Sequence, residues 1–335
     1  MAVTACLLVA GLMVAMVAGV CLGSVHLGVG DVLGAVGDNL TGRASRVDPI
    51  DQYIIWDLRV PRVLLAALVG AALALAGTAL QGLVRNPLAD PYVIGVSSGG
   101  TLGAVLVMAY GTTALAGLSV SVAAFAGAVV VLVAVFAFAQ ISGTFTDSRL
   151  VLAGVALSYV TTAITSFVQL QAQPDQISGI LFWTLGSVAA ARWSNVLLPL
   201  IVTVLCGGWL LTRGRGLNAL ALGDDDATAV GVDIRTFRLG LLVVAALLTA
   251  VSVSNAGGVG FVGLIVPQTV RLVVGGDHRR LLPLSAVAGA LLLVCVDLVA
   301  RTVASPAELP LTIFTSLIGG PLFLMMMRRK PAEQG

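Results

Sequence analysis

The sequence Arg59-Val-Pro-Arg62 leads into the uncharged run Val63–Val84, and the turn Asn86-Pro-Leu-Ala-Asp-Pro91 and the small-residue segment Gly95-Val-Ser-Ser-Gly-Gly100 follow. A helix of about 20 apolar residues crosses the roughly 30 Å hydrocarbon core of a bilayer. Val63–Val84 has 22 residues, so it is long enough. The turn cannot lie in lipid because its backbone amides would lack partners there. The stretch therefore predicts a membrane helix with two arginines before it and a tight loop after it.

Composition extends this prediction to the whole chain. Hydrophobic residues make up 58% of the 335 residues and charged residues only 10%, with a mean hydropathy of +1.05. Soluble domains carry about 25% charged residues. We therefore expect a protein surrounded by membrane lipid, and the low charge excludes a basic nucleic-acid binder. The cysteines lie in or beside apolar runs without CxxC spacing, which predicts small buried side chains rather than disulfides or a zinc site: Cys6, Cys21, Cys206 and Cys295.

The apolar runs predict ten spans within a single transmembrane domain, residues 1–335. They lie near 2–22, 61–84, 92–111, 114–140, 149–170, 193–212, 238–256, 258–274, 281–300 and 309–327. An even number of spans puts both termini on one side, and Arg328-Arg329-Lys330 indicates that this side is the cytoplasm. Twelve basic residues then lie inside and six outside. The predicted location is the cytoplasmic (inner) membrane, and the outer arginines run against the positive-inside tendency.

The polar segment 213–238 joins two predicted spans on the cytoplasmic side. It contains Leu217–Gly223, then Asp224-Asp225-Asp226, then Ala227–Val230 and Gly231. Acidic residues suit the positive N-terminal end of a helix, and glycine suits its C-terminal end. We expect a short helix lying across this face, either as a docking element for a soluble partner or as part of a solvated loop.

Three further features concern the remaining chain. The stretch Gly23–Asp57 is polar and predicted outside, and Pro174–Arg192 reads as a short amphipathic helix around Ile177–Val188 near the outer mouth. Small residues recur at four-residue spacing in two spans, which permits close helix contact: Gly70, Ala74 and Thr78, then Gly95, Gly99 and Gly103.

Several kinds of chemistry are excluded or disfavoured. Lys330 is the only lysine, so the chain has no GxxxxGK[ST] phosphate loop and cannot itself be a P-loop ATPase. His26 and His278 are predicted on opposite sides of the membrane, which argues against a two-histidine metal or haem site. A proton- or sodium-driven transporter keeps ionisable groups at mid-membrane, and no clear candidate is present. We expect no enzyme acting alone and no cofactor bound by this chain.

Motifs along nearly the whole chain resemble, in order, those of the permeases of ATP-binding-cassette importers for ferric siderophores, haem and cobalamin. The pattern begins with R-x-P-R, G-A-A-L-A-x-x-G-x-x-x-Q and N-P-L-A-x-P…G-V-S-x-G in Arg59–Gly100. The later matches are Ser148–Ala156, Trp183–Ser187, Leu220-Ala-Leu-Gly…Gly231-Val, Gly258–Pro267, Asp297–Arg301, Glu308-Leu-Pro310 and Gly319-Gly-Pro321.

The resemblance implies an all-α, ten-span permease of the type II importer architecture. It further implies a second permease subunit, identical or different, two cytoplasmic ATP-binding subunits that carry ATP and Mg²⁺, and an extracytoplasmic solute-binding protein. Family arginines that bind acidic residues of that protein match Arg59, Arg62 and Arg301. Arginine suits this role because its planar fork matches a carboxylate.

The family's cytoplasmic gate and coupling helices can also be placed. The gate matches Asn86 and Leu88, and then Asp147 and Ser148, although Asp147 stands where the family often has a small hydroxyl residue. The coupling helices match the segment 217–232, which favours its docking interpretation. The residues concerned are Leu217, Leu220, Leu222, Gly223, Asp224, Asp225, Asp226, Ala227, Val230 and Gly231.

The resemblance leaves the cargo open. Ferric siderophore is expected because it is the commonest cargo among the relatives, with haem or cobalamin as alternatives. A rival from another class is a secondary transporter or channel that needs no ATPase; a neighbouring gene for a Walker-motif ATPase would argue against it. Candidates for the path lining, among many possible sets, are Ser158, Thr161, Gln169 and Gln171.

Overall fold

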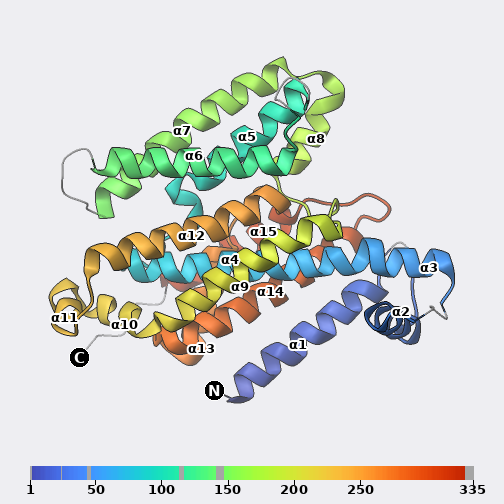
Figure 1. Cartoon of the computed structure of the whole chain (residues 1–335), viewed down its shortest axis with the longest axis horizontal. Helices are drawn as coiled ribbons and strands as arrows, with labels where there is room; N and C mark the ends of the chain where they lie inside the picture. The colour runs from blue at the N-terminus through green and yellow to red at the C-terminus, as the bar shows by residue number, and fades with distance from the viewer. Residues whose placement is uncertain (1, 24, 44–46, 113–116, 141–146, 329–335) are drawn as a thin grey trace.

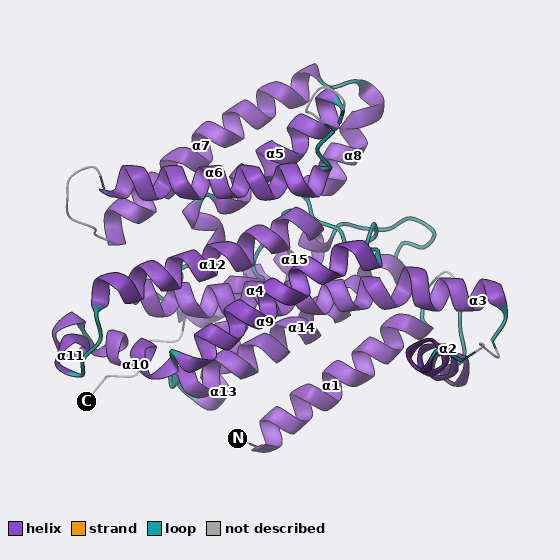
Figure 2. Ribbon diagram, in the orientation of Figure 1, coloured by secondary structure: helices purple, strands orange, loops and turns teal. Residues whose placement is uncertain are grey.

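The computed structural model describes residues 2–23, 25–43, 47–112, 117–140 and 147–328, and this part of the chain is helical without strands (Figures 1 and 2). Seven helices are long and apolar enough to cross a membrane. They are α1 (Ala2–Cys21), the continuous helix of α3 (Pro49–Tyr53), η1 (Ile54–Arg59) and α4 (Val60–Val84), α6 (Val120–Gln140), α7 (Asp147–Gln171), α9 (Trp193–Thr212), α12 (Ile234–Ala256) and α14 (His278–Thr302). Three shorter apolar helices are α5 (Val96–Tyr110), α13 (Val262–Val274) and α15 (Leu311–Arg328). The predicted ten-span, all-α architecture is confirmed.

Helix boundaries differ from the prediction mainly on the outer side. The helix leading into α4 begins at Pro49, where Asp48 accepts a hydrogen bond from the backbone N–H of Ile50. The predicted span starts at residue 61 because charged residues interrupt the apolar pattern before it. The wide π-helical turn η1 lies just before Pro61, which has no N–H to donate, so the helix continues through it.

The remaining helices are short and lie between spans. They are α2 (Val29–Thr41), η2 (Pro91–Ile94), α8 (Pro174–Thr184), α10 (Gly214–Leu222) and α11 (Asp224–Ala229). α2 lies in Gly23–Asp57, which the sequence marked only as a polar segment, and α8 confirms a short helix in 174–192. The cysteine prediction holds only in part: all four are free, but Cys6 and Cys295 are exposed whereas Cys21 and Cys206 are buried.

α4 forms the centre of the molecule, with 78% of its apolar window buried against 17% for α1. It packs against α14, α12, α13 and α9. α5, α6 and α7 form a second group that reaches this centre through α12 (Figure 1). α7 is only 22% buried, so much of its surface is left for lipid or for another subunit.

The two ends of the bundle can be assigned from contacts. Asn218 in α10 accepts a hydrogen bond from the N–H of His278, so α14 begins on the side of α10 and α11. Thr4 and Leu322 line one apolar cavity with Val274, just before α14. α1 therefore begins and α15 ends on this side, which we call the α10–α11 face. That this face is cytoplasmic stays a prediction from the basic residues.

Glycines allow α4 to contact its neighbours at close range, as the small-residue spacing predicted. A Cβ on Gly77 would lie 1.9 Å from the carbonyl oxygen of Gly263 in α13, and one on Gly70 would lie 2.2 Å from that of Gly289 in α14. Both distances are far below a permitted contact, so helix backbones meet here without intervening side chains.

We expect Gly77→Ala to lower the stability of the protein by about 1–3 kcal/mol, because α4 and α13 must separate to admit the methyl group. Thermal unfolding of the detergent-solubilised protein measures the loss. Gly208→Ala in α9 is the matched control, since a Cβ there has no heavy atom within 4 Å. Equal unfolding temperatures for the two variants would contradict the tight packing.

Candidate functional site

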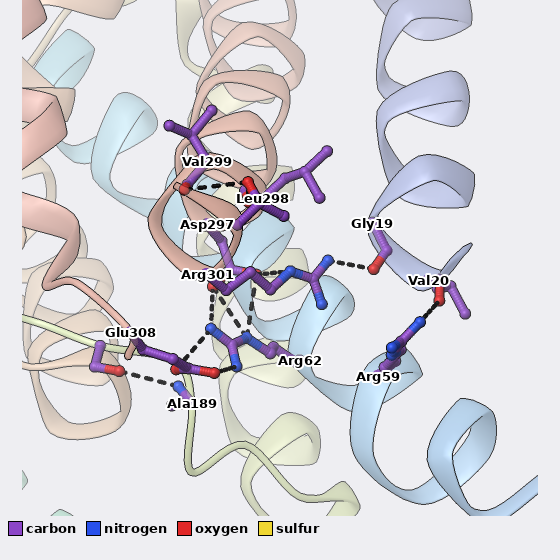
Figure 3. A network of polar contacts seen from close by, with 12 residues as sticks. Gly19, Val20, Arg59, Arg62, Ala189, Asp297, Leu298, Val299, Arg301 and Glu308 are labelled. Carbon is purple, nitrogen blue, oxygen red and sulfur yellow. Dashed lines mark hydrogen bonds and ion pairs between the residues drawn. The ribbon is translucent and has the colours of Figure 1, made fainter. Parts of the chain in front are cut away.

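Arg62 binds the carboxylates of Asp297 and Glu308 (Figure 3). Asp297 lies near the end of α14, and α14 begins beside α10, so these groups lie on the face opposite α10 and α11. Arg62 Nη2 donates to Oδ1 of Asp297 at 2.8 Å, and its Nε donates to the same oxygen at 3.0 Å. Its Nη1 donates to Oε1 of Glu308 at 2.7 Å. One guanidinium fork thus joins the start of α4 to α14 and to the loop before α15. Such bidentate pairs are the strong, geometrically specific form of a charge-assisted hydrogen bond.

Arg301 lies beside this pair, four residues after Asp297 on α14. Its Nε is 3.8 Å from Oδ2 of Asp297, and its Nη2 donates to the carbonyl oxygen of Gly19 in α1. The side chain of Asp297 is 2% exposed, so its negative charge is compensated from inside the protein by two arginines. Arg301 therefore links α1 to the same cluster.

Arg59 performs a different task, at the end of α1. Its Nη1 donates to the carbonyl oxygens of Val20 and Cys21 at 2.7 and 3.0 Å, and its Nη2 donates to that of Val25 at 2.6 Å. The last carbonyls of a helix have no partner within the helix and carry partial negative charge. Arg59 satisfies them and fixes α1 against the helix that becomes α4.

The structure brings the three predicted docking arginines together, but with their guanidinium groups turned inward. Arg59 and Arg301 are each 7% exposed, and the side chain of Arg62 is 12% exposed. Glu308 is the accessible member, with 39% of its side chain exposed. We call Arg59, Arg62, Asp297, Arg301 and Glu308 the arginine cluster. The spacing Asp297-x-x-x-Arg301 hinted at one pairing, whereas no local pattern could reveal the contacts of Arg62.

The first part of the predicted gate is the turn between α4 and α5, on the α10–α11 face. Asn86 Oδ1 accepts from the N–H of Leu88 at 2.9 Å, and Leu88 is 48% exposed. Gln268 of α13 donates to the carbonyl oxygen of Pro87 at 2.9 Å and to Gln81 Oε1 at 2.8 Å. Gln81 in turn donates to carbonyl oxygens of α13. Two buried amides therefore fasten this turn to α4 and α13.

The second part of the predicted gate lies at the start of α7. Asp147 and Ser148 are its first two residues, and their side chains lie outside the part that the structure describes. In the turn between α4 and α5, which carries the first part of the predicted gate, Asp90 accepts a hydrogen bond from the N–H of Tyr92. Burial nevertheless raises the pKa of Asp90 to about 6.

The predicted coupling segment forms two helices, α10 and α11, separated by Gly223 with φ +143°. Leu217 and Leu220 are fully buried under α10, whereas Leu222 is 76% exposed and Val230 after α11 is 70% exposed. Two large apolar side chains therefore project from this segment.

Ion pairs fix α11 to the spans, and hydrogen bonds of Asn218 fix α10. Asp224 pairs with Arg85 at 3.3 Å and with Arg238 at 3.1 Å. Asn218 Nδ2 donates to Oδ1 of Asp277 at 2.7 Å, and this bond is the main cause that lowers the pKa of Asp277. Asp225, Asp226 and the C-terminal Gly231 are exposed, and Ala227 is buried. The three aspartates form the first turn of α11, as expected for a helix N-terminus.

A polar cavity of about 410 Å³ lies between α5, α7 and α8. We call it the hydroxyl cavity, and none of the described residues that line it is charged. The lining consists of Tyr92, Ser97, Ser98, Thr101, Ser158, Thr162, Thr165, Ser166, Gln169, Leu181 and Thr184. Of the path candidates, Ser158 and Gln169 line it. Thr161 is buried and donates to Ser98 at 2.8 Å, whereas Gln171 accepts from Tyr110 at the end of α7.

The part of the chain that the structure describes has ten apolar helices, two short helices with exposed apolar side chains on one face and a buried ion cluster on the other, as expected of a polytopic membrane protein. Residues 11–329 match the FecCD transport family, and the chain belongs to that family. It is therefore an ATP-binding-cassette importer permease.

Three comparisons support this assignment. The cobalamin import system permease protein BtuC of Halobacterium salinarum is 45% identical over 83% of this chain and 74% of its own. The Fe(3+) dicitrate transport system permease protein FecD of Escherichia coli is 40% identical over 83% of this chain and 86% of its own. An inward-facing structure of a metal-chelate type ABC transporter superposes with a TM-score of 0.83 at 33% identity, covering 96% of this chain and 97% of that one.

Proposed function

We propose that this chain imports a metal chelate, with ferric siderophore as its cargo, across the cytoplasmic membrane. In this proposal a second permease subunit completes the path, two cytoplasmic subunits hydrolyse ATP with Mg²⁺, and an external solute-binding protein delivers the cargo. The observation that carries the proposal is the hydroxyl cavity, because it offers a large chelate many hydrogen-bonding groups and no charge.

The position of the hydroxyl cavity supports a role in the path. Thr162 and Ser166 of α7 line it and are exposed in the single subunit, although they lie in the middle of a span. Hydroxyl groups gain nothing from facing lipid tails, so such a surface suits a water-filled path or another subunit. The adjoining surface of α7 carries exposed apolar residues, including Tyr159, Phe167 and Leu170, which suit a lipid or subunit contact.

The arginine cluster supports docking of the binding protein by exchange. Glu308 already occupies Arg62 with a partly exposed carboxylate, whereas Asp297 is buried behind it. An acidic residue of the binding protein can replace Glu308 without exposing Asp297. Exchange of like groups leaves the charge balance unchanged, so docking requires only a small local movement. Arg59 and Arg301 add positive potential behind the same site.

The α10–α11 face supports docking of the ATP-hydrolysing subunits. Leu222 and Val230 project from it, while Leu217, Leu220 and the bonds of Asn218 and Asp224 fix it rigidly to the spans. A rigid element with exposed apolar side chains can transmit a movement of the partner to α4, α12 and α14.

Uptake by membrane vesicles tests the proposal. The vesicles contain this permease with its ATPase subunits and binding protein, and a panel of radiolabelled ferric siderophores is supplied with and without ATP. We expect uptake only when ATP and binding protein are both present. Uptake that proceeds equally without ATP would instead indicate a secondary transporter.

A second candidate cargo is cobalamin. It is favoured by the 45% identity to a permease of a cobalamin import system. Its amide-rich surface also suits an uncharged, hydrogen-bonding lining. Radiolabelled cobalamin in the same vesicles separates the two: uptake of cobalamin without uptake of any ferric siderophore would select the second candidate.

We expect Thr162→Val to raise the cargo concentration for half-maximal uptake about fivefold, because it removes one hydrogen bond of about 1 kcal/mol while keeping the side-chain volume. Vesicle uptake at graded cargo concentrations measures the change. The same substitution at Thr41, an exposed residue of α2 outside the cavity, is the control. An unchanged value for Thr162→Val would argue that the cavity does not meet the cargo.

A further inference from the structure

A second polar pocket, of about 380 Å³, lies where α9 ends, α10 begins and α12 begins. It is on the α10–α11 face, separate from the arginine cluster and with no lining residue in common with the hydroxyl cavity. Its lining includes Trp209, Arg213, Arg215, Asp233 and Phe237. We call it the α9–α12 pocket. Figure 1 shows these helix ends together at the end of the molecule that carries α10 and α11.

Close packing of aromatic rings on glycines shapes the pocket. A Cβ on Gly216 would lie 2.8 Å from the ring of Phe237, and one on Gly240 would lie 2.9 Å from the ring of Trp209. The guanidinium carbon of Arg213 lies 5.4 Å from the centre of the Trp209 ring, in cation–π contact. The aromatic walls and one of the cations are therefore held in place before any ligand arrives.

The charges of the pocket are not balanced within the protein. Arg213 and Arg215 are exposed, and neither forms a salt bridge within the described residues. Other arginines of this face do: Arg85 and Arg238 pair with Asp224, and Arg280 pairs with Asp277.

One carboxylate belongs to the pocket. Asp233 accepts a hydrogen bond from the Thr236 hydroxyl at 2.6 Å. Two guanidinium groups and one carboxylate give the pocket a net positive charge, which favours binding of an anion.

The surroundings of the pocket indicate where this anion comes from. Leu205 and Leu211 of α9 are 67% and 48% exposed, and Leu239 and Val243 of α12 are 44% and 39% exposed. In a chain that spans a membrane, such side chains face hydrocarbon. The pocket lies at the ends of these two spans, and tryptophan and arginine at a span end are typical of the headgroup region.

We propose that the α9–α12 pocket binds the phosphate group of a phospholipid, whose acyl chains lie along the exposed apolar residues of α9 and α12. Arg213 and Arg215 hold the phosphate, since guanidinium groups match its geometry and basic residues near a membrane surface attract acidic lipid headgroups. The bound lipid fills the space between two spans next to α10, where the subunit is open in isolation.

The test uses the complete importer complex, purified in mild detergent, with native mass spectrometry of retained phospholipid. The variant R213Q/R215Q removes both cations of the pocket. R235Q/R280Q is the matched control, because it removes two exposed arginines of the same face that do not line the pocket. We expect wild type and control to retain phospholipid and R213Q/R215Q to retain at least about tenfold less.

A second measurement adds brominated phosphatidylglycerol and records quenching of tryptophan fluorescence. Part of the quenching should disappear in Trp209→Phe and should resist competition by inorganic phosphate, which lacks acyl chains. Equal lipid retention by R213Q/R215Q and the control would overturn the proposal. Displacement of the lipid by inorganic phosphate would also overturn it. If R213Q/R215Q lost the ATPase subunits but retained lipid, the pocket would belong to the protein interface, and the proposal would be overturned as well. R213K/R215K keeps the charges and should retain an intermediate amount of lipid, even if R213Q/R215Q folds poorly. Loss of all retained phospholipid from R213K/R215K would also overturn the proposal.

Discussion

Arg62→Gln is expected to destabilise the protein by about 3–5 kcal/mol and to abolish cargo uptake. The substitution leaves the carboxylate of Asp297, 2% exposed, with only Arg301 at 3.8 Å. A buried charge that loses its partner cannot recover the solvation it gave up on folding, which is why removal of one member costs more than removal of both. Thermal unfolding in detergent and uptake by reconstituted vesicles measure the two effects.

The double variant Arg62→Gln with Asp297→Asn separates structure from docking. Because the buried carboxylate disappears together with its main partner, we expect part of the lost stability to return; Arg301 keeps its hydrogen bond to Gly19 but loses Asp297. Uptake should stay absent if Arg62 also binds the delivery protein. A double variant that regains both stability and uptake would show that Arg62 serves only the fold. A single variant as stable as wild type would instead contradict the buried pair.

Glu308→Gln is the matched control for the same cluster. Its side chain is 39% exposed, so solvent screens the attraction to Arg62, and we expect a loss of no more than about 1 kcal/mol. Arg62 keeps Asp297 in this variant, and docking by exchange needs no carboxylate at position 308. Glu308→Gln should therefore bind the solute-binding protein at least as tightly as wild type, whereas the Arg62 variants should not bind it.

The spans could be predicted from sequence because hydropathy alone determines them. Lipid demands an uninterrupted apolar helix, and each of the ten runs coincides with a helix of the structure. The boundary at residue 61 failed for the same reason: outside lipid a helix can carry charges, so hydropathy cannot show that it begins at Pro49. The sequence likewise shows a glycine at position 223, but not that the coupling segment divides there into two helices.

Long-range pairing lay outside what the sequence could show. Arg62 and Asp297 are 235 positions apart, and only the packing of α4 on α14 brings them together. The resemblance implied that Arg62 binds an acidic residue of the solute-binding protein, and only the fold shows that it also has two carboxylate partners within the chain. The hydroxyl cavity was partly visible, because Ser158 and Gln169 are polar residues in an apolar helix, but its other wall comes from α5 and α8.

Leu222→Gln is expected to reduce ATP-dependent uptake at least about tenfold while leaving the unfolding temperature unchanged. Leu222 is 76% exposed at the end of α10, so most of its apolar surface gains free energy only when a partner covers it. Burying a leucine side chain is worth about 1.5–3 kcal/mol, which corresponds to a tenfold or larger change in affinity. Pull-down of the ATPase subunits and vesicle uptake measure the loss.

The control for Leu222→Gln is Leu33→Gln, since Leu33 in α2 is 59% exposed on the opposite face. It changes the same chemistry where no ATPase can bind, so uptake should persist. Leu220 is fully buried in the same helix, so Leu220→Gln should unfold the segment, whereas Leu222→Gln should only uncouple it. Full ATPase binding and uptake by Leu222→Gln would place the coupling contact elsewhere on this face, with Val230 as the remaining exposed apolar candidate of the segment.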